Sequence, residues 1–254
     1  MSATMTSDQL AAYLDRFLRV LEIPDAPQAL NGLQVGNSGR VSRILGAVDG
    51  CQASIDAAVA RGADFLIVHH GLFWAGLQRV TGRFGRRVRT LIQHDVALYS
   101  AHLPLDCHAE VGNNAVLAGD LGLEAPAPFG RYQGIEIGVM GGLDCPLSDL
   151  AQRVAERLGA APRVIAKGPP RTRRVAIVTG GASDLIAEAH ERGVDTFITG
   201  EGPHHTYFDA EEWGLNVIYA GHYASETVGV QALGAHVRDR FGIAFEFFDH
   251  PTGL

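Results

Sequence analysis

A chain of 254 residues is long enough to bury a substantial core, in one large domain or in two small ones. Its formal net charge of -7 argues against general affinity for nucleic acid or for an anionic membrane, and no apolar segment approaches the roughly 18 to 20 residues of a membrane span. The three cysteines form no Cys-x-x-Cys pair, and the N-terminus is neither basic nor apolar, so we expect a cytoplasmic protein without a secretory signal.

Helices and strands are predicted to alternate through the first half of the chain. Ser7 can cap a first helix whose apolar stripe runs to Leu21, and prolines at 24 and 27 end it. The later strands are predicted at residues 44–48, 65–68 and 96–101, and the later helices at residues 53–61, 88–93 and 113–121.

The second half continues this alternation. Its strands are predicted at residues 133–140, 175–179, 196–199, 216–220 and 244–248, and its helices at residues 147–158, 183–192, 207–213 and 225–241. The pattern predicts an α/β fold of two similar lobes. Because Pro126 and Pro128 interrupt the alternation, we place the first lobe at residues 1–126 and the second at residues 127–254. The last helix and strand are candidates to pack back on the first lobe.

An internal repeat relates the two halves. Residues 43–71 align with residues 174–202 without a gap, and both segments contain Arg-Gly-x-Asp. Chance resemblance between βαβ units is the alternative, but a second pair of segments, residues 99–106 and 219–226, recurs in the same order and favours a duplication. In that second pair, His102 matches His222, and Asp106 matches Glu226.

Two adjacent histidines end the most apolar strand. The run from Phe65 to Val68 is typical of a strand buried on both faces of a sheet, and His69, His70 and Gly71 follow it. Open α/β sheets bind ligands at the carboxyl ends of their strands. Neighbouring strand residues point to opposite faces, so both imidazoles can converge only where the strand gives way to a loop. The alternative is one packed and one solvated histidine.

A metal centre is the best explanation for the polar residues near the predicted strand ends. Three imidazoles and two carboxylates gather there: His69, His70, Asp106, His222 and Glu226. Mixed nitrogen and oxygen ligands suit Zn, Fe, Mn or Co, and two such ions would leave open positions for a substrate. His222 and Glu226 lie four residues apart, so we expect a regular helix to carry that pair, whereas Pro104 favours a loop for His102 and Asp106.

Five motifs together resemble the Nif-three-like dinuclear-metal-centre family, whose members often carry the name GTP cyclohydrolase 1 type 2-like. The motifs span most of the chain: Asn31–Gly36, Val68–Trp74, His102–Asp106 with Gly112–Asn114, Thr199–Glu201, and Ala220–Glu226. The chain lacks the extra central domain of longer members. Tyr223 also stands where some relatives have the second histidine of a Gly-His-His stretch.

The resemblance implies a metal arrangement and an assembly. One divalent ion would be bound by His70 and Asp106 and the other by His69 and His222, with Glu226 as the bridge. Six copies of the chain would form a toroidal homohexamer whose sites face an internal cavity. The expected partners are therefore other copies of the chain and a small-molecule substrate, with a nucleotide as the candidate, while membrane and nucleic acid are not expected.

Further polar residues are candidates for catalysis. Besides Glu226, they are His102, which can orient a ligand or bind substrate, and Glu201 and His205, which with His204 can act as general acid or base. The alternatives are a hydrogen-bonded core histidine for the first and a solvated loop for the others. Asn113 and Asn114 are expected to cap a helix, and Cys107 to point away from the site. The arginines at 79, 83, 86, 87 and 89 form a basic cluster that is either a solvated face or a contact for phosphate or single-stranded nucleic acid.

These observations support three functional hypotheses. The first is a metal-dependent hydrolase that uses a metal-activated water, with a purine nucleotide such as GTP as the candidate substrate. The second is a non-catalytic assembly that binds or handles metal ions. The third is a phosphoesterase or a ring associated with nucleic acid.

Overall fold

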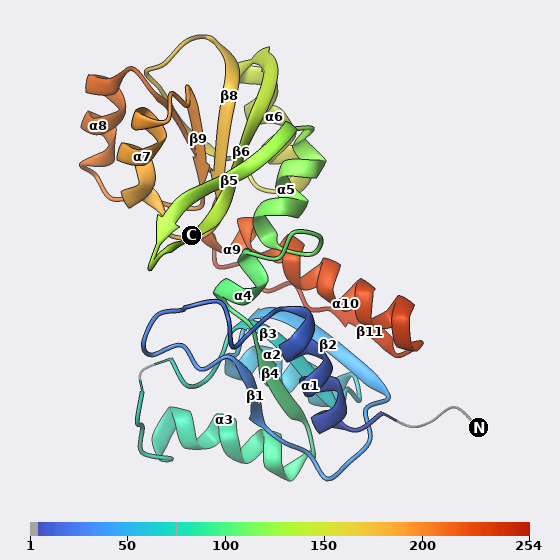
Figure 1. The fold of residues 1–254 in the computed structure, drawn as a ribbon. Coiled ribbons are helices and arrows are strands. Elements are labelled where there is room, and N and C mark those ends of the chain that lie inside the picture. The colour runs from blue at the N-terminus through green and yellow to red at the C-terminus, as the bar shows by residue number, and fades with distance from the viewer. Residues whose placement is uncertain (1–4, 75) are drawn as a thin grey trace. The chain divides into compact units, whose positions relative to one another are not determined.

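The structure is a computed structural model that describes residues 5–74 and 76–254. The absence of a secretory signal was expected partly from residues 1–4, which lie outside the described residues. The chain divides into two compact units, and each has its own sheet (Figure 1). Unit 1 comprises Met1–Leu105 and Val230–His250, and unit 2 comprises Asp106–Gly229 and Pro251–Leu254.

Unit 1 contains a five-stranded sheet in the order β1-β4-β3-β2-β11. Its strands are β1 (Gly32–Val35), β2 (Arg43–Asp49), β3 (Phe65–His70), β4 (Ala97–Ser100) and β11 (Ala244–Phe247). All neighbours pair in parallel except β1, which pairs antiparallel with β4. The last strand of the chain therefore completes the sheet of unit 1.

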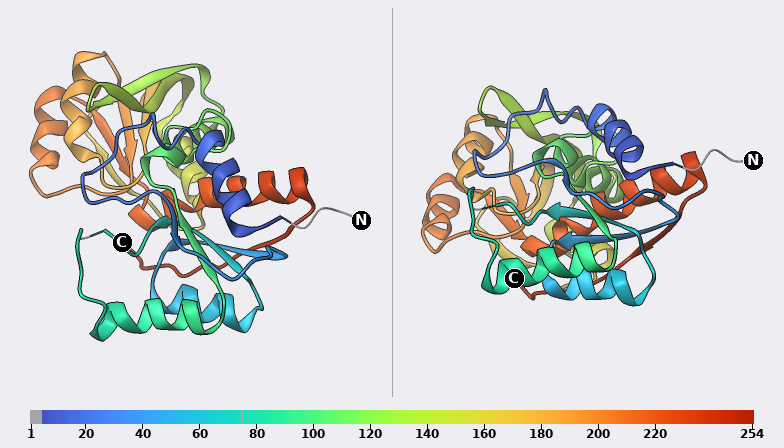
Figure 2. Two further views of the ribbon diagram at one scale, coloured as in Figure 1. Left: turned by 60° about the horizontal axis from the view of Figure 1, so that its bottom comes forward. Right: turned by 90° about the horizontal axis from the view of Figure 1, so that it is seen from below.

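Helices cover both faces of this sheet. The helices α2 (Gln52–Ala60) and α3 (Gly82–Gln93) lie on one face, and α1 (Ser7–Phe17) and the later part of α10 (Thr227–Phe241) lie on the other (Figure 2). Residues 65–69 of β3 are buried, as a strand covered on both faces requires. The core beneath α2 and α3 includes Leu45, Ile55, Leu66, Val68, Leu91 and Leu98.

Unit 2 contains a six-stranded sheet in the order β5-β6-β8-β9-β10-β7. Its strands are β5 (Glu124–Tyr132), β6 (Ile135–Pro146), β7 (Arg163–Ala166), β8 (Arg171–Val178), β9 (Thr196–Thr199) and β10 (Asn216–Tyr219). The three central strands β8, β9 and β10 are parallel, and β7 pairs antiparallel with β10.

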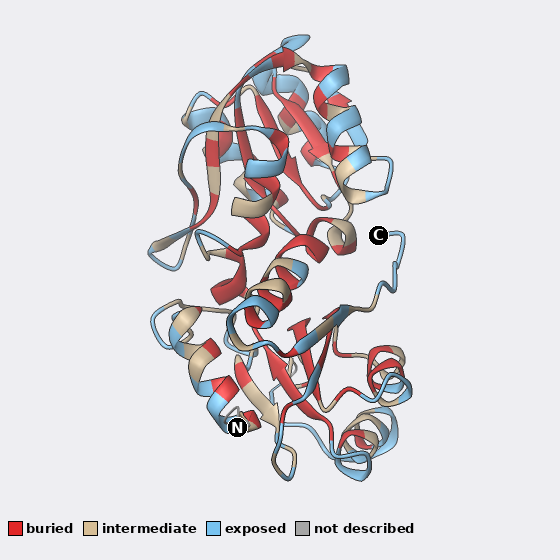
Figure 3. Ribbon diagram, turned by 90° about the vertical axis from the view of Figure 1, so that its right-hand side faces the viewer, coloured by how far each residue is buried: buried red, intermediate tan, exposed pale blue. Residues whose placement is uncertain are grey.

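The helices of unit 2 also lie on both faces of its sheet. On one face are α5 (Asn113–Leu121) and α6 (Leu147–Leu158), which share a core with β8 and β9, and on the other are η1 (Ser183–Leu185), α7 (Ile186–Glu191) and α8 (Thr206–Trp213) (Figure 1). In each unit the central strands are largely buried, and the exposed residues lie on the outer faces of the helices, in the loops and on edge strands such as β5 and β11 (Figure 3). The two short helices α4 (Leu103–Asp106) and α9 (His222–Ser225) complete the chain.

The predicted α/β fold class with two similar lobes is confirmed, and one residue shows the likeness in detail. Asp64 accepts hydrogen bonds from the backbone N–H groups of Ser42 and Arg43 at the start of β2. Asp195, its match in the repeat, accepts equivalent bonds from Arg173 and Arg174 in β8. The recurring Arg-Gly-x-Asp motif thus fixes the same turn before β3 and before β9.

The division into units differs from the predicted boundary between residues 126 and 127, which falls inside β5. Pro126 and Pro128 suggested a break between lobes, but β5 lies at the edge of its sheet and pairs with β6 alone. An edge strand tolerates proline, because the missing N–H faces away from the pairing partner. Gln133 and Gly134, predicted as the start of a strand, have positive φ and form the turn of the β5–β6 hairpin.

The helices of the described chain are also informative in their length and hydropathy. Among residues 5–74 and 76–254, no helix is both long and apolar enough to cross a membrane.

The predicted loop at 103–106 is one turn of helix, α4. Pro104 lies in its first turn, where the N–H of a residue has no helical partner in any case.

Candidate metal centre

His69 and His70 lie at the carboxyl end of β3, and each ring is held by one nitrogen. The ring of His69 is fully buried, and its Nδ1 lies 2.9 Å from the carbonyl oxygen of Ala101. Nδ1 of His70 lies 2.9 Å from Oδ1 of Asp49, at the end of the neighbouring strand β2. A carbonyl and a carboxylate only accept hydrogen bonds, so Nδ1 donates in both rings and Nε2 carries the lone pair that a cation requires.

His102 joins these two histidines in unit 1. Its ring centroid lies 5.0 Å from that of His69 and 5.7 Å from that of His70. The three residues each offer one ligand atom, and these atoms lie within 4.8 Å of one another. Nδ1 of His102 donates to Oδ1 of Asp25 at 2.7 Å, which again makes Nε2 the coordinating atom. Unit 1 therefore carries a group of three imidazoles that can hold a metal ion.

Asp106 is a buried carboxylate of unit 2, with 7% of its surface exposed. Its Oδ1 accepts a hydrogen bond from Nδ2 of Asn113 at 2.8 Å and a longer one from Oγ1 of Thr179 at 3.4 Å. Asn114 donates to the backbone carbonyls of Asp106 and Ile137. The two asparagines were expected to cap α5, but the N-cap is Gly112, and their buried side chains hold Asp106 and its backbone in place.

His222 lies between two carboxylates of unit 2. Its Nδ1 lies 2.8 Å from Oε1 of Glu201, and its Nε2 lies 3.2 Å from Oε1 of Glu226, which is 3% exposed. The hydrogen bond to Glu226 raises the pKa of His222 to about 9; burial opposes this shift, and the charges of Glu226 and Glu201 reinforce it. A cation that binds Nε2 must therefore displace a proton that is held between His222 and Glu226.

Glycines make room for this pair in the loops after β8 and β9. Gly180 has φ of +70°, and a Cβ there would overlap Oε1 of Glu226. A Cβ on Gly200 would lie 2.7 Å from Cα of His222. The close approach of Glu226 therefore explains why residue 180 is a glycine.

The other predicted residues are distributed as follows. Glu201 contacts His222, whereas His205 is exposed and lies at the start of α8, and the ring of His204 packs edge-on against Phe208. The arginines of the basic cluster at 79, 83, 86 and 89 are exposed, the last three along α3. Sequence reasoning missed Asp25, in the loop before β1, and Asp49, and it assigned no role in the site to Asn31 of the first motif.

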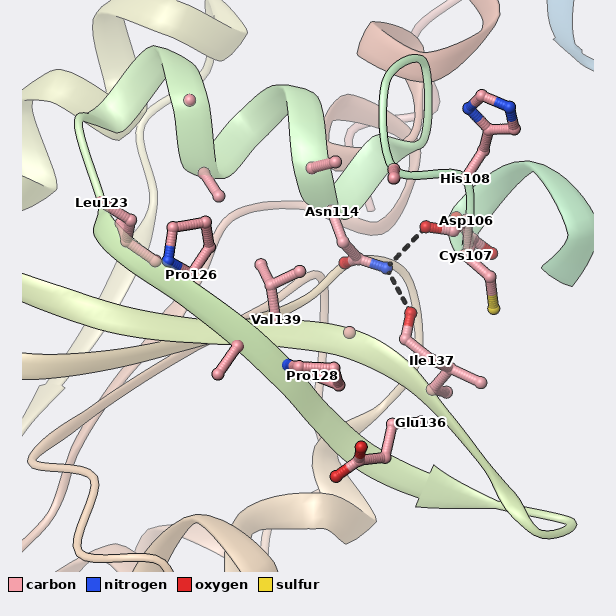
Figure 4. Close-up of a pocket in the computed structure, with 16 residues that line it drawn as sticks. Asp106, Cys107, His108, Asn114, Leu123, Pro126, Pro128, Glu136, Ile137 and Val139 are labelled. Carbon is pink, nitrogen blue, oxygen red and sulfur yellow. Dashed lines mark hydrogen bonds between the residues drawn. The ribbon is translucent and has the colours of Figure 1, made fainter.

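A cavity of about 340 Å³ lies in unit 2 beside Asp106, between α5 and the β5–β6 hairpin (Figure 4). Its walls are mostly apolar, with Leu123, Pro128 and Val139 among the lining residues, and Glu136 and His108 contribute polar groups. Cys107, expected to point away as a small buried side chain, is half-buried and lines this cavity. The volume lies within the roughly 300 to 1,000 Å³ of small-molecule sites.

The residues present fit divalent transition metals. Imidazole nitrogens and carboxylate oxygens are ligands that Zn, Fe, Mn and Co accept. Carboxylates or a carbonyl orient every imidazole through Nδ1, which is the outer-sphere arrangement of metal-binding histidines. The chain therefore carries groups of histidine and glutamate residues that can hold a metal ion.

Comparisons with known proteins agree with this description. The family profile described as Duf34/NIF3 (NGG1p interacting factor 3) matches residues 5–252. Two relatives, each named "GTP cyclohydrolase 1 type 2 homolog", come from Deinococcus radiodurans (45% identical over 97% of this chain and 94% of the relative) and Halobacterium salinarum (47%, over 98% and 99%). A crystal structure of a Thermus thermophilus protein superposes with a TM-score of 0.91 at 43% identity, over 98% of this chain and 100% of that one. The resemblance read from the motifs is confirmed.

Proposed function

Since the chain belongs to the Duf34/NIF3 family, we propose that it is a metal-dependent hydrolase with two divalent ions per chain. In this proposal the metal ligands are the five predicted residues: His69, His70, Asp106, His222 and Glu226. The observation that carries the proposal is the shared use of Nδ1. Each of the three ligand imidazoles already has its Nδ1 engaged by an acceptor, so Nε2 is the nitrogen through which each ring can coordinate.

The residues around the ligands suit hydrolysis. Divalent ions, when bound, lower the pKa of water and stabilise a developing oxyanion. Glu201 accepts a hydrogen bond from Nδ1 of His222 beside the ligands and can take up or return protons there. Asn113 and Thr179 donate hydrogen bonds to Asp106 and hold its carboxylate in place.

We propose a purine nucleotide as the substrate, opened by hydrolysis at its imidazole ring. The support is the printed name of the relatives, which are called homologues of GTP cyclohydrolase 1 type 2. The cavity beside Asp106 has the apolar walls and the volume to receive a planar ring. In this proposal the ring enters the cavity and the reacting bond faces Asp106.

The test is turnover by the full chain reconstituted in turn with Zn²⁺, Fe²⁺, Mn²⁺ and Co²⁺. GTP is the first substrate, followed by other purine nucleotides and a panel of phosphoesters. We expect metal-dependent release of the ring-opened product from a purine nucleotide. If only the phosphoesters react, releasing phosphate or an alcohol, the protein is a phosphoesterase and the cyclohydrolase reaction is excluded. A fully loaded protein that turns over no member of the panel would overturn the hydrolase proposal.

A further inference from the structure

The basic cluster of unit 1, which consists of the arginines at 79, 83, 86, 87 and 89, has no role in the proposed function. Residues 65–94 contain these five arginines and no aspartate, glutamate or lysine, although the whole chain has a net charge of -7. The net charge therefore conceals a segment of the opposite sign. We infer that the basic cluster is a binding surface for the phosphate backbone of nucleic acid, independent of base sequence.

The helix α3 presents the cluster on the outside of unit 1 (Figure 1). Its core-facing side chains recur every three or four positions, at Phe84, Val88 and Leu91, and they pack in the core beneath α2 and α3. The arginines fill positions between them, and those at 79, 83, 86 and 89 are exposed. Arg83 and Arg89 are six residues apart, so the exposed guanidinium groups follow about 9 Å of the helix axis.

No carboxylate neutralises the cluster. None of its five arginines forms an ion pair within residues 5–74 and 76–254, whereas Arg61 and Arg192 each pair with a glutamate elsewhere. Asp56 of the adjacent helix α2 accepts a hydrogen bond from Gln52, which also donates to Thr90 of α3. The guanidinium groups are therefore available to an anion from outside the chain.

The cluster also opposes two rules of helix stability. Arg83 lies in the first turn of α3, where the positive end of the helix dipole repels a cation, and no acidic residue occupies that turn. Like charges are neighbours on the helix surface, since Arg83 and Arg87 are four residues apart and Arg86 and Arg89 are three apart. A solvated face, the competing explanation, commonly mixes charges of both signs. Local rules that are broken without compensation inside the fold indicate a functional surface, and a bound polyanion would compensate for both.

Phosphate groups of a polymer suit this surface. A guanidinium group is always charged and donates two parallel hydrogen bonds to phosphate. Four exposed arginines along one strip match a chain of repeated phosphates better than a single phosphate. An anionic membrane fits less well, because the apolar face of α3 is buried in the core and cannot enter lipid. Leu77 and Val80 are exposed beside the cluster in the sequence, so lipid vesicles are the alternative to test.

The experiment measures binding of the full chain to a fluorescein-labelled DNA duplex of mixed sequence, and to one of its single strands, by fluorescence anisotropy. The salt concentration is varied from about 50 to about 200 mM. If each of the four exposed arginines neutralises one phosphate, the logarithm of the duplex affinity falls with the logarithm of the salt concentration at a slope of about -3.6. The affinity then falls on the order of 100-fold over this range, and a duplex of different sequence behaves in the same way.

A triple variant tests whether the cluster causes this dependence. Combining Arg83→Gln, Arg86→Gln and Arg89→Gln leaves one exposed arginine of the cluster and should reduce the slope to about -0.9. Lysine at the same three positions keeps the charge and should retain the slope, which separates charge from packing.

The matched control removes the same charge from exposed arginines of unit 2, by combining Arg153→Gln, Arg173→Gln and Arg174→Gln. It should leave the slope unchanged. Equal salt dependence in the two glutamine variants would overturn the inference, as would the absence of binding to either DNA at about 50 mM salt. Binding to vesicles that contain phosphatidylglycerol, without binding to DNA, would also overturn it and assign the surface to lipid. No readout requires metal or turnover, so failure of the hydrolase proposal leaves this inference standing.

Discussion

Four histidines at the carboxyl edges of the two sheets share one hydrogen-bonding pattern. His69, His70, His102 and His222 each engage Nδ1 with a carbonyl or a carboxylate. With Nδ1 as the donor, the lone pair of His69 and of His70 lies at Nε2 before any ion arrives, whereas at His222 an ion would displace the proton between Nε2 and Glu226. The free energy of ordering these rings is thus provided by folding, and it need not be provided by the metal.

The close approach of Gly180 to Glu226 leads to a matched pair of substitutions. Gly180→Ala introduces a Cβ at positive φ and drives it into Oε1 of Glu226, whereas Gly193→Ala, at φ of +68° with open space around it, introduces the backbone strain alone. Both should destabilise unit 2 by about 1–2 kcal/mol through the left-handed backbone. Only Gly180→Ala should also weaken metal binding, measured by chelator competition. Equal metal affinities in the two variants would contradict the close packing described for Glu226.

The carboxylate of Asp25 makes the stability of unit 1 depend on pH. Burial raises the pKa of Asp25, but the hydrogen bond and charge of His102, with further bonds from Asn31 and Ala26, outweigh burial and hold the pKa below its ordinary value of 3.8. A lowered folded-state pKa stabilises the fold above pH 3.8, and this contribution is lost as the pH falls through the folded-state value.

We therefore expect Asp25→Asn to be less stable than the natural chain at pH 7 and to lose less stability on acidification. Urea unfolding between pH 3 and pH 7 measures both quantities. Asp95→Asn is the control, since Ser38 lowers the pKa of that carboxyl at the surface and its removal should have a smaller effect. Parallel stability curves for Asp25→Asn and the natural chain would show that the buried carboxylate does not stabilise the fold through its charge.

The candidate ligands can be named from the sequence, whereas the residues that hold their rings cannot. The His-His-Gly motif consists of adjacent residues and is therefore visible in the sequence, and the repeat identifies His222 through its match with His102. Asp25 and Asp49 lie 77 and 21 residues before the rings they hold, and no periodicity links such positions. Asparagine before a helix commonly caps it, which is why the sequence predicts caps at Asn113 and Asn114. In the structure both side chains are buried and donate hydrogen bonds to Asp106 instead.

At the scale of elements, the parallel strands were predictable and the hairpin was not. The apolar runs of β2, β3, β8 and β9 are buried on both faces, so each stands out in the sequence. The strand β5 was not predicted, because Pro126 and Pro128 indicate a break in a strand. At the edge of a sheet proline is tolerated, since its missing N–H faces away from the paired strand. The prediction of Gln133 as strand failed because a hairpin turn requires positive φ there.

The β5–β6 hairpin and α5 enclose the cavity, and this arrangement leads to a prediction about the substrate. Ala115 of α5 lines the cavity, so Ala115→Leu should fill part of it. We expect kcat/KM for the nucleotide to fall roughly tenfold or more, as when a pocket loses the space for its ligand, with metal affinity unchanged. Ala187→Leu, on the exposed face of α7, is the control for an added leucine on a helix of the same unit. Unimpaired kcat/KM in Ala115→Leu would remove this cavity from the proposed function.

At the scale of the whole molecule, duplication explains why histidines and carboxylates recur at strand ends. The antiparallel edge strands β1 and β7 flank β4 and β10 in the same way, and Asp64 and Asp195 fix equivalent turns. Unit 1 carries the imidazoles of His69, His70 and His102, whereas unit 2 carries the carboxylates of Asp106 and Glu226 with the imidazole of His222. We propose, from the family resemblance, that six copies of the chain assemble into a ring; light scattering in solution measures the mass of that assembly.

His70→Ala separates a hydrolase from a metal-handling assembly. In a hydrolase, turnover falls because a ligand is lost, by more than the roughly 10- to 100-fold of an outer-sphere change, while thermal stability and assembly size stay close to those of the natural chain. In a non-catalytic assembly the ions serve structure, so the same substitution lowers the melting temperature and breaks up the oligomer. His94→Ala, which removes an exposed histidine after α3, should change none of these quantities. One preparation of each variant is measured for metal content, melting temperature, light scattering and turnover. If the natural chain shows no turnover and His70→Ala loses its assembly, the ions have a structural role only, and the hydrolase is excluded.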